Sequence, residues 1–520
     1  MMNQEVLRDV MEKGLLLDKE VFDIINLISD KGLAKAILDN LERVSGQKMI
    51  TKSILRNNEV LVKSILSNFS GEEELKFEYF FKEKKEIVEE VKKKIGGEEI
   101  NYSPDYKIYY ANTLPDHKLE VKDFTGHFRA RYHEIQKILM NRPEVQQNLV
   151  SIGKIGGNRS SISLIGMVSE KKVTKNKNLL IKMEDLTGSI NVLVKVDNED
   201  LFSKFDELQL DDIVAVKGSG NRDIMFAHDI FYPDSFIYEK IKFEEDINIA
   251  FLSDLHCGSD RHLSQSLDNF LNWINSDDIN AKKIKYLFFV GDNVDGVGIF
   301  PGQDKVLKLK SMDEQYQLLA NYLKRIPKNI TMFMCPGQHD AVRVAEPQPI
   351  INKRYAPYLY EIENLVLVTN PTLIKLIEKD KEFKILMYHG ASIHGFINEI
   401  KELRLMKAHN SPAKAVKHML KRRHLAPSHG SFVYIPNMEK DPLVISETPD
   451  ILCTGEVHRL DIENYNGTII ITGSCWQAQT PFEEKVGNIP DPGKVPVFNL
   501  KTRELKIYDF GVEEEINREY

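Results

Sequence analysis

Residues 246 to 475 carry the pattern that most restricts the fold of this chain. Short apolar runs alternate there with helical stretches, and five runs stop on residues that can bind metals: "INIAFLSD", "IKYLFFVGD", "ITMFMCPGQHD", "FKILMYHG" and "DILCTGEVH". This alternation predicts an α/β domain, in which ligands collect beyond the carboxyl ends of the strands. We therefore expect the residues at these strand ends to lie together.

A metal centre is the interpretation that accounts for all five ends at once. A single Asp-x-His after an apolar run is often a capped turn, and a lone buried histidine is more often a core residue, but a series at one sheet edge is hard to explain in that way. Carboxylates mixed with imidazoles suit Mn²⁺, Fe²⁺ or Zn²⁺. Seven of the nine strand-end residues are candidate ligands, which is too many for one ion and predicts two ions that together favour phosphate-ester hydrolysis. The strand-end residues are Asp254, His256, Asp292, Gln338, His339, Asp340, His389, Glu456 and His458.

Composition limits the class of protein. The 520 residues predict three or four domains, with enough hydrophobic residues (42%) to form cores. No apolar run reaches the roughly 18 residues that cross a bilayer, and the first residues lack the apolar core of a secretory signal, so we expect a cytoplasmic protein with no membrane partner.

The four cysteines form no CxxC pair and are expected to be free thiols. The net charge of −8 argues against coating DNA by bulk electrostatics but permits a local basic track.

Changes in pattern along the chain predict four segments. Residues 1–70 have the apolar spacing of a small helical module, and residues 71–118 form a charged linker. Residues 119–240 combine a helix with five short β-like runs separated by glycines, which favours an OB-like all-β barrel acting either as a scaffold or in binding nucleic acid. Residues 241–520 form the α/β domain with the strand-end residues.

The series Asp-x-His, Gly-Asp, Gly-Gln-His-Asp, His and Gly-Glu-Val-His resembles that of the calcineurin-like metallophosphoesterases, which have an α+β sandwich fold. Longer stretches are similar to the small subunits of archaeal family D DNA polymerases: "GMVSEKKVTKNKNLLIKMEDLTG", "CPGQHDAVRVAEPQP", "LKRRHLAPSHG" and "PDILCTGEVHR". The resemblance covers residues 120 to 510 in detail. It implies a 3′–5′ exonuclease that proofreads single-stranded or mismatched 3′ ends of DNA for a separate large polymerase subunit.

The resemblance also implies a role for each strand-end residue. His339 matches the family's acid, which protonates the leaving 3′ oxygen, and Asp340 is expected to orient it by accepting its other N–H. One ion is held by Asp254, His256 and His458, Asp292 bridges, and the second ion is completed by Gln338, His389 and Glu456.

Two of these positions depart from the superfamily pattern, and both belong to the second ion. Asparagine is usual where Gln338 stands, and histidine is usual where Glu456 stands. A carboxylate in place of an imidazole makes that site harder and more negative, which favours Mn²⁺ or Mg²⁺ over Zn²⁺. A weakened second site is the alternative.

The segment from Lys401 to Ser431 contains eight Lys and Arg against one Glu. It is either a solvated helix face or a track for phosphates or a partner, in which Lys421, Arg422 and Arg423 would contact DNA. Arg343 is a further candidate for a substrate phosphate. Two rival functions remain, a non-catalytic scaffold subunit and a phosphatase acting on another class of substrate.

Overall fold

The computed structural model describes residues 15–17, 21, 31–45, 49–50, 54, 58, 61–62, 65, 100–102, 105–113 and 118–516. The chain divides into two units, residues 1–96 and 97–520. In the first, helix α3 (Lys31–Ser45) packs its apolar face, which includes Leu33, Ile37 and Leu41, beside the parallel pair β1 (Leu16–Leu17) and β2 (Met49–Ile50). Much of the predicted helical module, and the charged run from residue 71, lie outside the described residues.

The second unit begins with two strands that fall inside the predicted charged linker. Strands β3 (Ile100–Tyr102) and β4 (Tyr106–Tyr110) form a hairpin, and β4 pairs antiparallel with β14 (Thr372–Glu378). The buried Ile108 joins the core of the large domain. The boundary expected at residue 118 therefore differs from the structure, because a short strand in a charged context is stabilised by a partner more than 200 residues away.

A closed barrel follows, as the five short β-like runs predict. Its strands are β5 (Arg159–Val173), β6 (Leu179–Asp185), β7 (Gly188–Val194), β9 (Ile224–Phe231) and β8 (Ile213–Gly220), in that spatial order. Alternate residues such as Ile181, Met183 and Val192 fill the interior, the period expected of strands that bury one face. Helix α9 (Glu199–Asp206) lies between β7 and β8.

Helix α7 (Val121–Met140) precedes the barrel and packs against it. Tyr132, Ile135 and Leu139, which lie three or four residues apart on one face of the helix, contact barrel residues such as Ile165. Two short helices connect α7 to the first barrel strand, α8 (Pro143–Gln146) and η1 (Ile152–Lys154).

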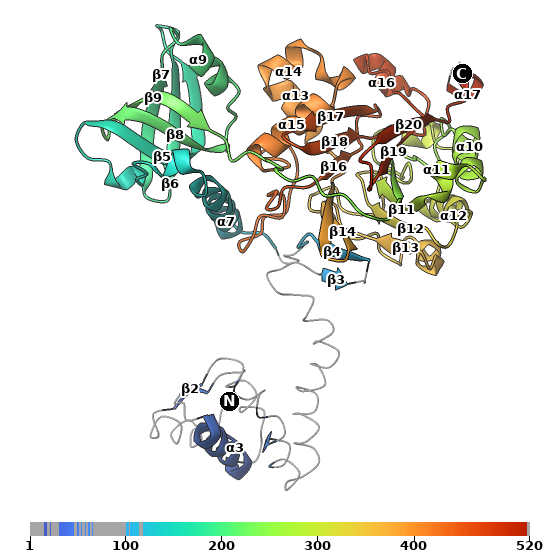
Figure 1. Ribbon diagram of the computed structural model, residues 1–520, viewed down its shortest axis with the longest axis horizontal. Helices are drawn as coiled ribbons and strands as arrows, with labels where there is room; N and C mark the ends of the chain where they lie inside the picture. Colours follow the sequence, from blue (N-terminus) through green and yellow to red (C-terminus); the bar gives the residue numbers. More distant parts are fainter. Residues whose placement is uncertain are drawn as a thin grey trace. The chain divides into compact units, whose positions relative to one another are not determined.

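Two mixed sheets form the large domain. In spatial order, the six-stranded sheet is β13 (Leu365–Leu367), β12 (Thr331–Cys335), β11 (Ile284–Val290), β10 (Asn248–Leu252), β19 (Lys494–Asn499) and β20 (Leu505–Asp509). The seven-stranded sheet is β17 (Asp461–Tyr465), β18 (Thr468–Thr472), β16 (Ile451–Thr454), β15 (Lys381–Met387), β14, β4 and β3. Phe251, Phe288 and Phe333 of the first sheet share one apolar cluster with Ile374 and Ile385 of the second. The sheets therefore face each other as a sandwich (Figure 1).

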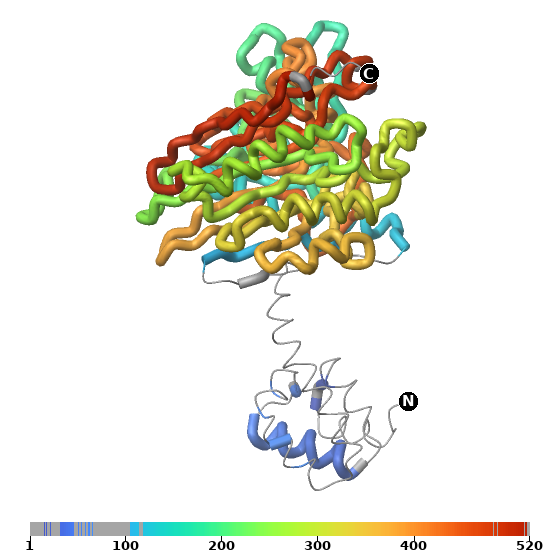
Figure 2. Tube along the Cα trace, turned by 90° about the vertical axis from the view of Figure 1, so that its right-hand side faces the viewer, coloured from blue at the N-terminus to red at the C-terminus, as the bar shows by residue number. Residues whose placement is uncertain are grey.

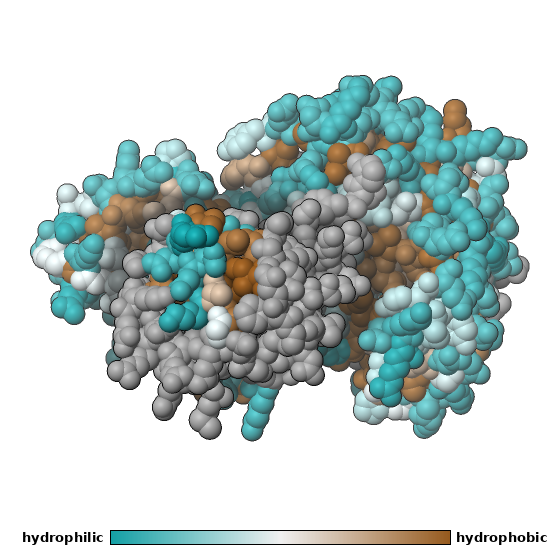
Figure 3. All heavy atoms as spheres, turned by 90° about the horizontal axis from the view of Figure 1, so that it is seen from below, coloured by the Kyte–Doolittle hydropathy of each residue, from teal (hydrophilic) through white to brown (hydrophobic). Residues whose placement is uncertain are grey.

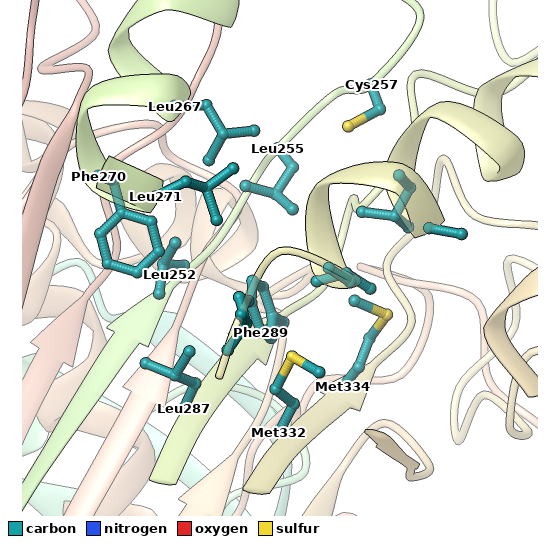
Figure 4. Close-up of a cluster of buried hydrophobic side chains, with 14 of the residues drawn as sticks. Leu252, Leu255, Cys257, Leu267, Phe270, Leu271, Leu287, Phe289, Met332 and Met334 are labelled. Carbon is teal, nitrogen blue, oxygen red and sulfur yellow. The ribbon is translucent and has the colours of Figure 1, made fainter. Parts of the chain in front are cut away.

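Helices cover the outer face of each sheet. Leu267 and Phe270 of α10 (Ser264–Ile274), with Leu319 of α12 (Met312–Leu323), pack on Phe289 and Met332 of the six-stranded sheet (Figure 4). Figure 2 views the molecule from the side on which these helices lie in Figure 1. The other sheet is covered by α13 (Ile393–Glu399), α14 (Lys401–Leu405) and α15 (Ala413–Arg422). The remaining short elements are α11 (Ile279–Lys282), η2 (Gln303–Lys305), η3 (Pro357–Glu361), η4 (Ala408–Asn410), α16 (Pro481–Val486) and α17 (Glu513–Ile516).

Hydrophilic side chains predominate over much of the described surface in Figure 3, with apolar patches between them. The mean hydropathy of the chain is −0.33. Among the helices that the structure describes, none is both long enough and apolar enough to pass through a membrane. The fold class predicted from the sequence, an α+β sandwich preceded by an all-β barrel, is confirmed.

Candidate metal centre

The predicted strand-end residues come together at one edge of the sandwich. Strands β10, β11 and β12 run parallel in one sheet, and β15 and β16 run parallel in the other. The carboxyl ends of both sets meet, so the centre is built between two sheets, whereas the sequence pattern alone indicated one sheet edge. Three groups of side chains have ligand atoms within 4.8 Å of one another: Asp254, His256 and His458; Asp254, Asp292 and His389; and His256, Asp295 and His339.

Asp292 lies at the middle of the centre. Its Oδ2 is 3.3 Å from Nε2 of His389, 3.9 Å from Nε2 of His339 and 4.0 Å from Nε2 of His256. Its Oδ1 accepts a hydrogen bond from the backbone N–H of His339 at 2.9 Å. Burial raises the pKa of Asp292, but the imidazoles of His389 and His339 outweigh burial and hold that pKa well below its usual value. A carboxylate in this position is suited to bridge two cations.

On one side of Asp292 lie Asp254, His256 and His458. The Nε2 atoms of His256 and His458 are 3.1 Å apart, and His458 Nε2 is 3.6 Å from Asp254 Oδ1. The Nδ1 of His256 lies 3.1 Å from Asp295 Oδ1, and that of His458 lies 3.0 Å from Glu483 Oε1. With Nδ1 directed at a carboxylate, the Nε2 of each imidazole faces the centre, which is the arrangement in which a histidine binds a metal ion.

On the other side lie His389, Glu456 and Gln338. His389 Nδ1 donates to the carbonyl of Val290 at 3.0 Å, and its Nε2 is 3.2 Å from Glu456 Oε2. Gln338 Nε2 donates to the same Glu456 oxygen at 2.7 Å. The two residues that depart from the superfamily pattern are therefore neighbours, although their positions are 118 residues apart in the sequence.

The backbone at the centre is strained. Asp254, His256, Asp292, Glu456 and His458 all have positive φ angles, between 45° and 73°. Non-glycine residues rarely adopt this region, which costs about 1–3 kcal/mol per residue, and such strain clusters at functional sites. Three glycines give the ligands room, because a Cβ at Gly291, Gly337 or Gly455 would overlap His389, Asp292 or Asp254, respectively.

Asp295, which the sequence-based prediction missed, orients two of the histidines. Its carboxylate accepts from His256, and its backbone carbonyl accepts from His339 Nδ1 at 2.6 Å. Asp340, expected to support His339, instead accepts hydrogen bonds from Asn293, Gly337 and the Tyr316 hydroxyl. That expectation is wrong because the Asp340 side chain turns inward and braces the loops under the site. The signal for Asp295 was its position in "GDNVDG", three residues after Asp292.

The four basic residues predicted to contact DNA have structural partners instead. Arg422 is buried and pairs with Asp212 of the barrel domain at 2.9 Å, and Lys421 pairs with Glu207. Arg423 donates to the carbonyls of Ile445 and Ser446. Arg343 donates to the carbonyls of Thr113 and Pro347. Each guanidinium or ammonium group is engaged within the fold, which counts against the predicted contact with DNA.

One buried atom supports the assignment of the centre to metal ions. Within the described part of the chain, Asp254 Oδ2 is buried and forms no hydrogen bond. A buried polar atom without a partner costs about 1–3 kcal/mol, and a cation would remove that cost. The donors are carboxylates, imidazoles and one amide, which suit divalent transition ions. The residues present therefore fit two such ions.

Comparison with known proteins agrees with this architecture. Residues 249–460 match the model of the B-subunit family of DNA polymerases alpha and epsilon, and residues 162–223 match that of the OB-fold nucleic acid binding domain. Among solved structures, a phosphodiesterase described as a novel archaeal enzyme is 12% identical, with 50% of this chain and 99% of that chain covered and a TM-score of 0.24. The two family models thus match the parts of the chain that form the sandwich and the barrel, respectively.

Curated relatives give a narrower assignment. The DNA polymerase II small subunit of Methanothermobacter thermautotrophicus is 36% identical over 74% of this chain and 79% of its own length. The small subunit from Pyrococcus furiosus is 37% identical over 75% of this chain, and the match spans 64% of that relative's length. This chain belongs to the family of archaeal DNA polymerase II small subunits.

Proposed function

We propose that this protein is a metal-dependent 3′–5′ exonuclease that removes mismatched nucleotides as the small subunit of a two-subunit DNA polymerase. The observation that carries the proposal is the set of ligands around Asp292, where three imidazole nitrogens converge on one carboxylate oxygen. A scaffold that had lost catalysis would have no need for this strained, buried arrangement. A large polymerase subunit and the 3′ end of DNA are the proposed partners.

The residues divide the proposed reaction between them. Asp254, His256 and His458 would hold one divalent ion, His389, Glu456 and Gln338 the other, with Asp292 shared. When bound, the two ions would neutralise the charge of the scissile phosphate and activate a water molecule for in-line attack.

His339 is the proposed acid. Its Nδ1 donates to the Asp295 carbonyl, which leaves Nε2, 3.9 Å from Asp292 Oδ2, facing the centre. As water attacks phosphorus and the bond to the 3′ oxygen breaks, Nε2 would donate its proton to that oxygen, and the proton lost by water would pass to solvent. The products would be a nucleoside monophosphate and a shortened strand with a free 3′ hydroxyl.

Replacing His339 by alanine tests the acid role. Degradation of a 3′-mismatched primer with Mn²⁺ should slow by about 10²- to 10⁴-fold, the usual effect of losing a positioned acid. His133→Ala, on the exposed face of α7, is a matched control that should cut like the wild type. Equal cutting by wild type and His339→Ala would exclude the acid role. A wild-type protein that cut nothing even with its large subunit present would favour the scaffold.

The unusual pair at the second ion gives a separate prediction. The double variant Gln338→Asn, Glu456→His should shift the preference from Mn²⁺ toward Zn²⁺ by about one order of magnitude, because an imidazole is a softer ligand than a carboxylate. Calorimetric titration with each metal would measure this shift. The surface changes Gln147→Asn and Glu144→His provide the control. If DNA affinity changed and metal preference did not, the assignment of these residues to an ion would be wrong.

A further inference from the structure

A loop beside the metal centre exposes apolar and basic side chains together. It runs from Gly296 to Lys310, "GVGIFPGQDKVLKLK", and is called the 296–310 loop below. Val297, Ile299 and Phe300 expose 45%, 40% and 44% of their surface, respectively. Adjacent exposed apolar side chains of this kind mark interaction sites more often than plain surface.

The loop is attached to the site through Asp295. The side-chain carboxylate of Asp295 orients His256, and its backbone carbonyl orients His339. Gln303, which is buried, donates to the Asp295 carbonyl at 2.8 Å and accepts from the N–H of Ile299 at 2.9 Å. A Cβ at Gly296 would overlap both the His339 carbonyl oxygen and the side chain of Ile299. The apolar tip is thus held directly next to the candidate acid.

Both ends of the loop are held by one buried amide. Gln315 of α12 accepts from the N–H of Gly296 at 2.8 Å and donates to the carbonyls of Gly296 and Leu309, at 3.1 and 2.9 Å. The backbone N–H groups of Lys308 and Leu309 donate to the carbonyl of Gly258, just beyond the ligand His256. The loop therefore has a defined shape, set by hydrogen bonds to the same segments that carry the ligands.

The second half of the loop is basic. Lys305, Lys308 and Lys310 are exposed, and only Asp304 in the loop opposes them. Across the ranges that the structure describes, none of these lysines forms an ion pair with a carboxylate. Three free ammonium groups beside a carboxylate-rich centre would draw a polyanion to it.

We propose that the 296–310 loop binds the terminal single-stranded nucleotides of the DNA 3′ end. Phe300 stacks on a base, Ile299 and Val297 extend that contact, and the three lysines contact phosphates. Stacking with a backbone track is how proteins bind single strands irrespective of sequence, because every base has a π-face. The inference rests on the proposed function, since it names how the nuclease holds its substrate.

Binding of a short fluorescein-labelled single-stranded oligonucleotide to the full chain tests the loop, with fluorescence anisotropy measured in Ca²⁺. Phe300→Ala should raise Kd by about tenfold, as expected for the loss of one stacked base. The triple variant Lys305→Gln, Lys308→Gln, Lys310→Gln should raise Kd further and reduce the slope of log affinity against log salt by about 2.

Tyr238→Ala is the matched control. Tyr238 is 96% exposed, and its neighbour Ile237 contacts the β17–β18 turn, at the opposite end of β18 from the metal centre. Loop variants that bind DNA like the wild type would overturn the proposal. So would loop variants that bind DNA normally but lose the large subunit, since the loop would then be a protein-docking surface.

Hydrolysis of a small phosphodiester by the wild-type protein separates this inference from the proposed function. If the wild type hydrolysed neither DNA nor the small diester while the loop variants still weakened DNA binding, the nuclease proposal would fail and the loop would stand as a DNA-binding element. If the wild type cut DNA and the loop variants bound it normally, only the loop inference would fail.

Discussion

Replacing Asp292 by asparagine is expected to abolish divalent-ion binding and to slow DNA cleavage by at least about 10³-fold, equivalent to about 4 kcal/mol. Asp292 Oδ2 is the atom on which His256, His339 and His389 converge. An amide supplies no negative charge, so the carboxylate that would lie between the two cations and the three imidazoles would be lost. Asparagine keeps an oxygen at Oδ1 to accept from His339 N–H, which preserves the local backbone.

Thermal unfolding with and without Mn²⁺ measures the binding part of this prediction. A ligand that binds only the folded state raises Tm by mass action, so the wild type should show the rise and Asp292→Asn should not. Asp277→Asn removes an exposed carboxylate and should behave like the wild type. If Asp292→Asn kept both the Mn²⁺-dependent rise and the cutting, the centre would not be the one described above.

Replacing Arg422 by methionine is expected to lower the free energy of unfolding by about 3–5 kcal/mol, the cost of leaving a buried charge without its partner. Arg422 and Asp212 are 2% and 1% exposed at their side chains, and Arg422 also donates to the Glu207 carbonyl at 2.7 Å. These contacts join α15 of the sandwich to the barrel domain. The variant should therefore lose the barrel's docking as well as stability.

Urea unfolding and limited proteolysis between Tyr232 and Ile247 would report these two effects. Adding Asp212→Asn to Arg422→Met removes the stranded charge and should recover part of the loss. Lys414→Met, on the same helix, breaks the partly exposed pair with Glu463 and should cost less than about 1 kcal/mol. An Arg422→Met protein as stable as the Lys414→Met protein would show that the pair does not hold the domains together.

Local sequence patterns were sufficient to predict the candidate metal ligands wherever these residues directly follow an apolar run. Asp254, His256, Asp292, His389, Glu456 and His458 all follow buried strands, and parallel strands bring such ends to a common edge. The five barrel strands were likewise visible as short runs of β-favouring residues between glycines, since alternation and turn residues are properties of neighbouring positions.

Tertiary structure decided what depends on distant partners. The basic run at Lys421–Arg423 has the composition of a phosphate track, but Asp212 and Glu207, more than 200 positions earlier, neutralise two of its charges. Asp295 and Asp340 are carboxylates of similar context, and only the packing shows that Asp295 orients the histidines while Asp340 braces loops. Strand β4 pairs with the distant strand β14, and β3 in turn pairs with β4. The sequence by itself determined which residues can bind ions, because side-chain chemistry and the ends of strands depend on neighbouring positions in the chain. The fold decided which charged side chains remain free to contact DNA, because ion pairs form between residues that are close in space.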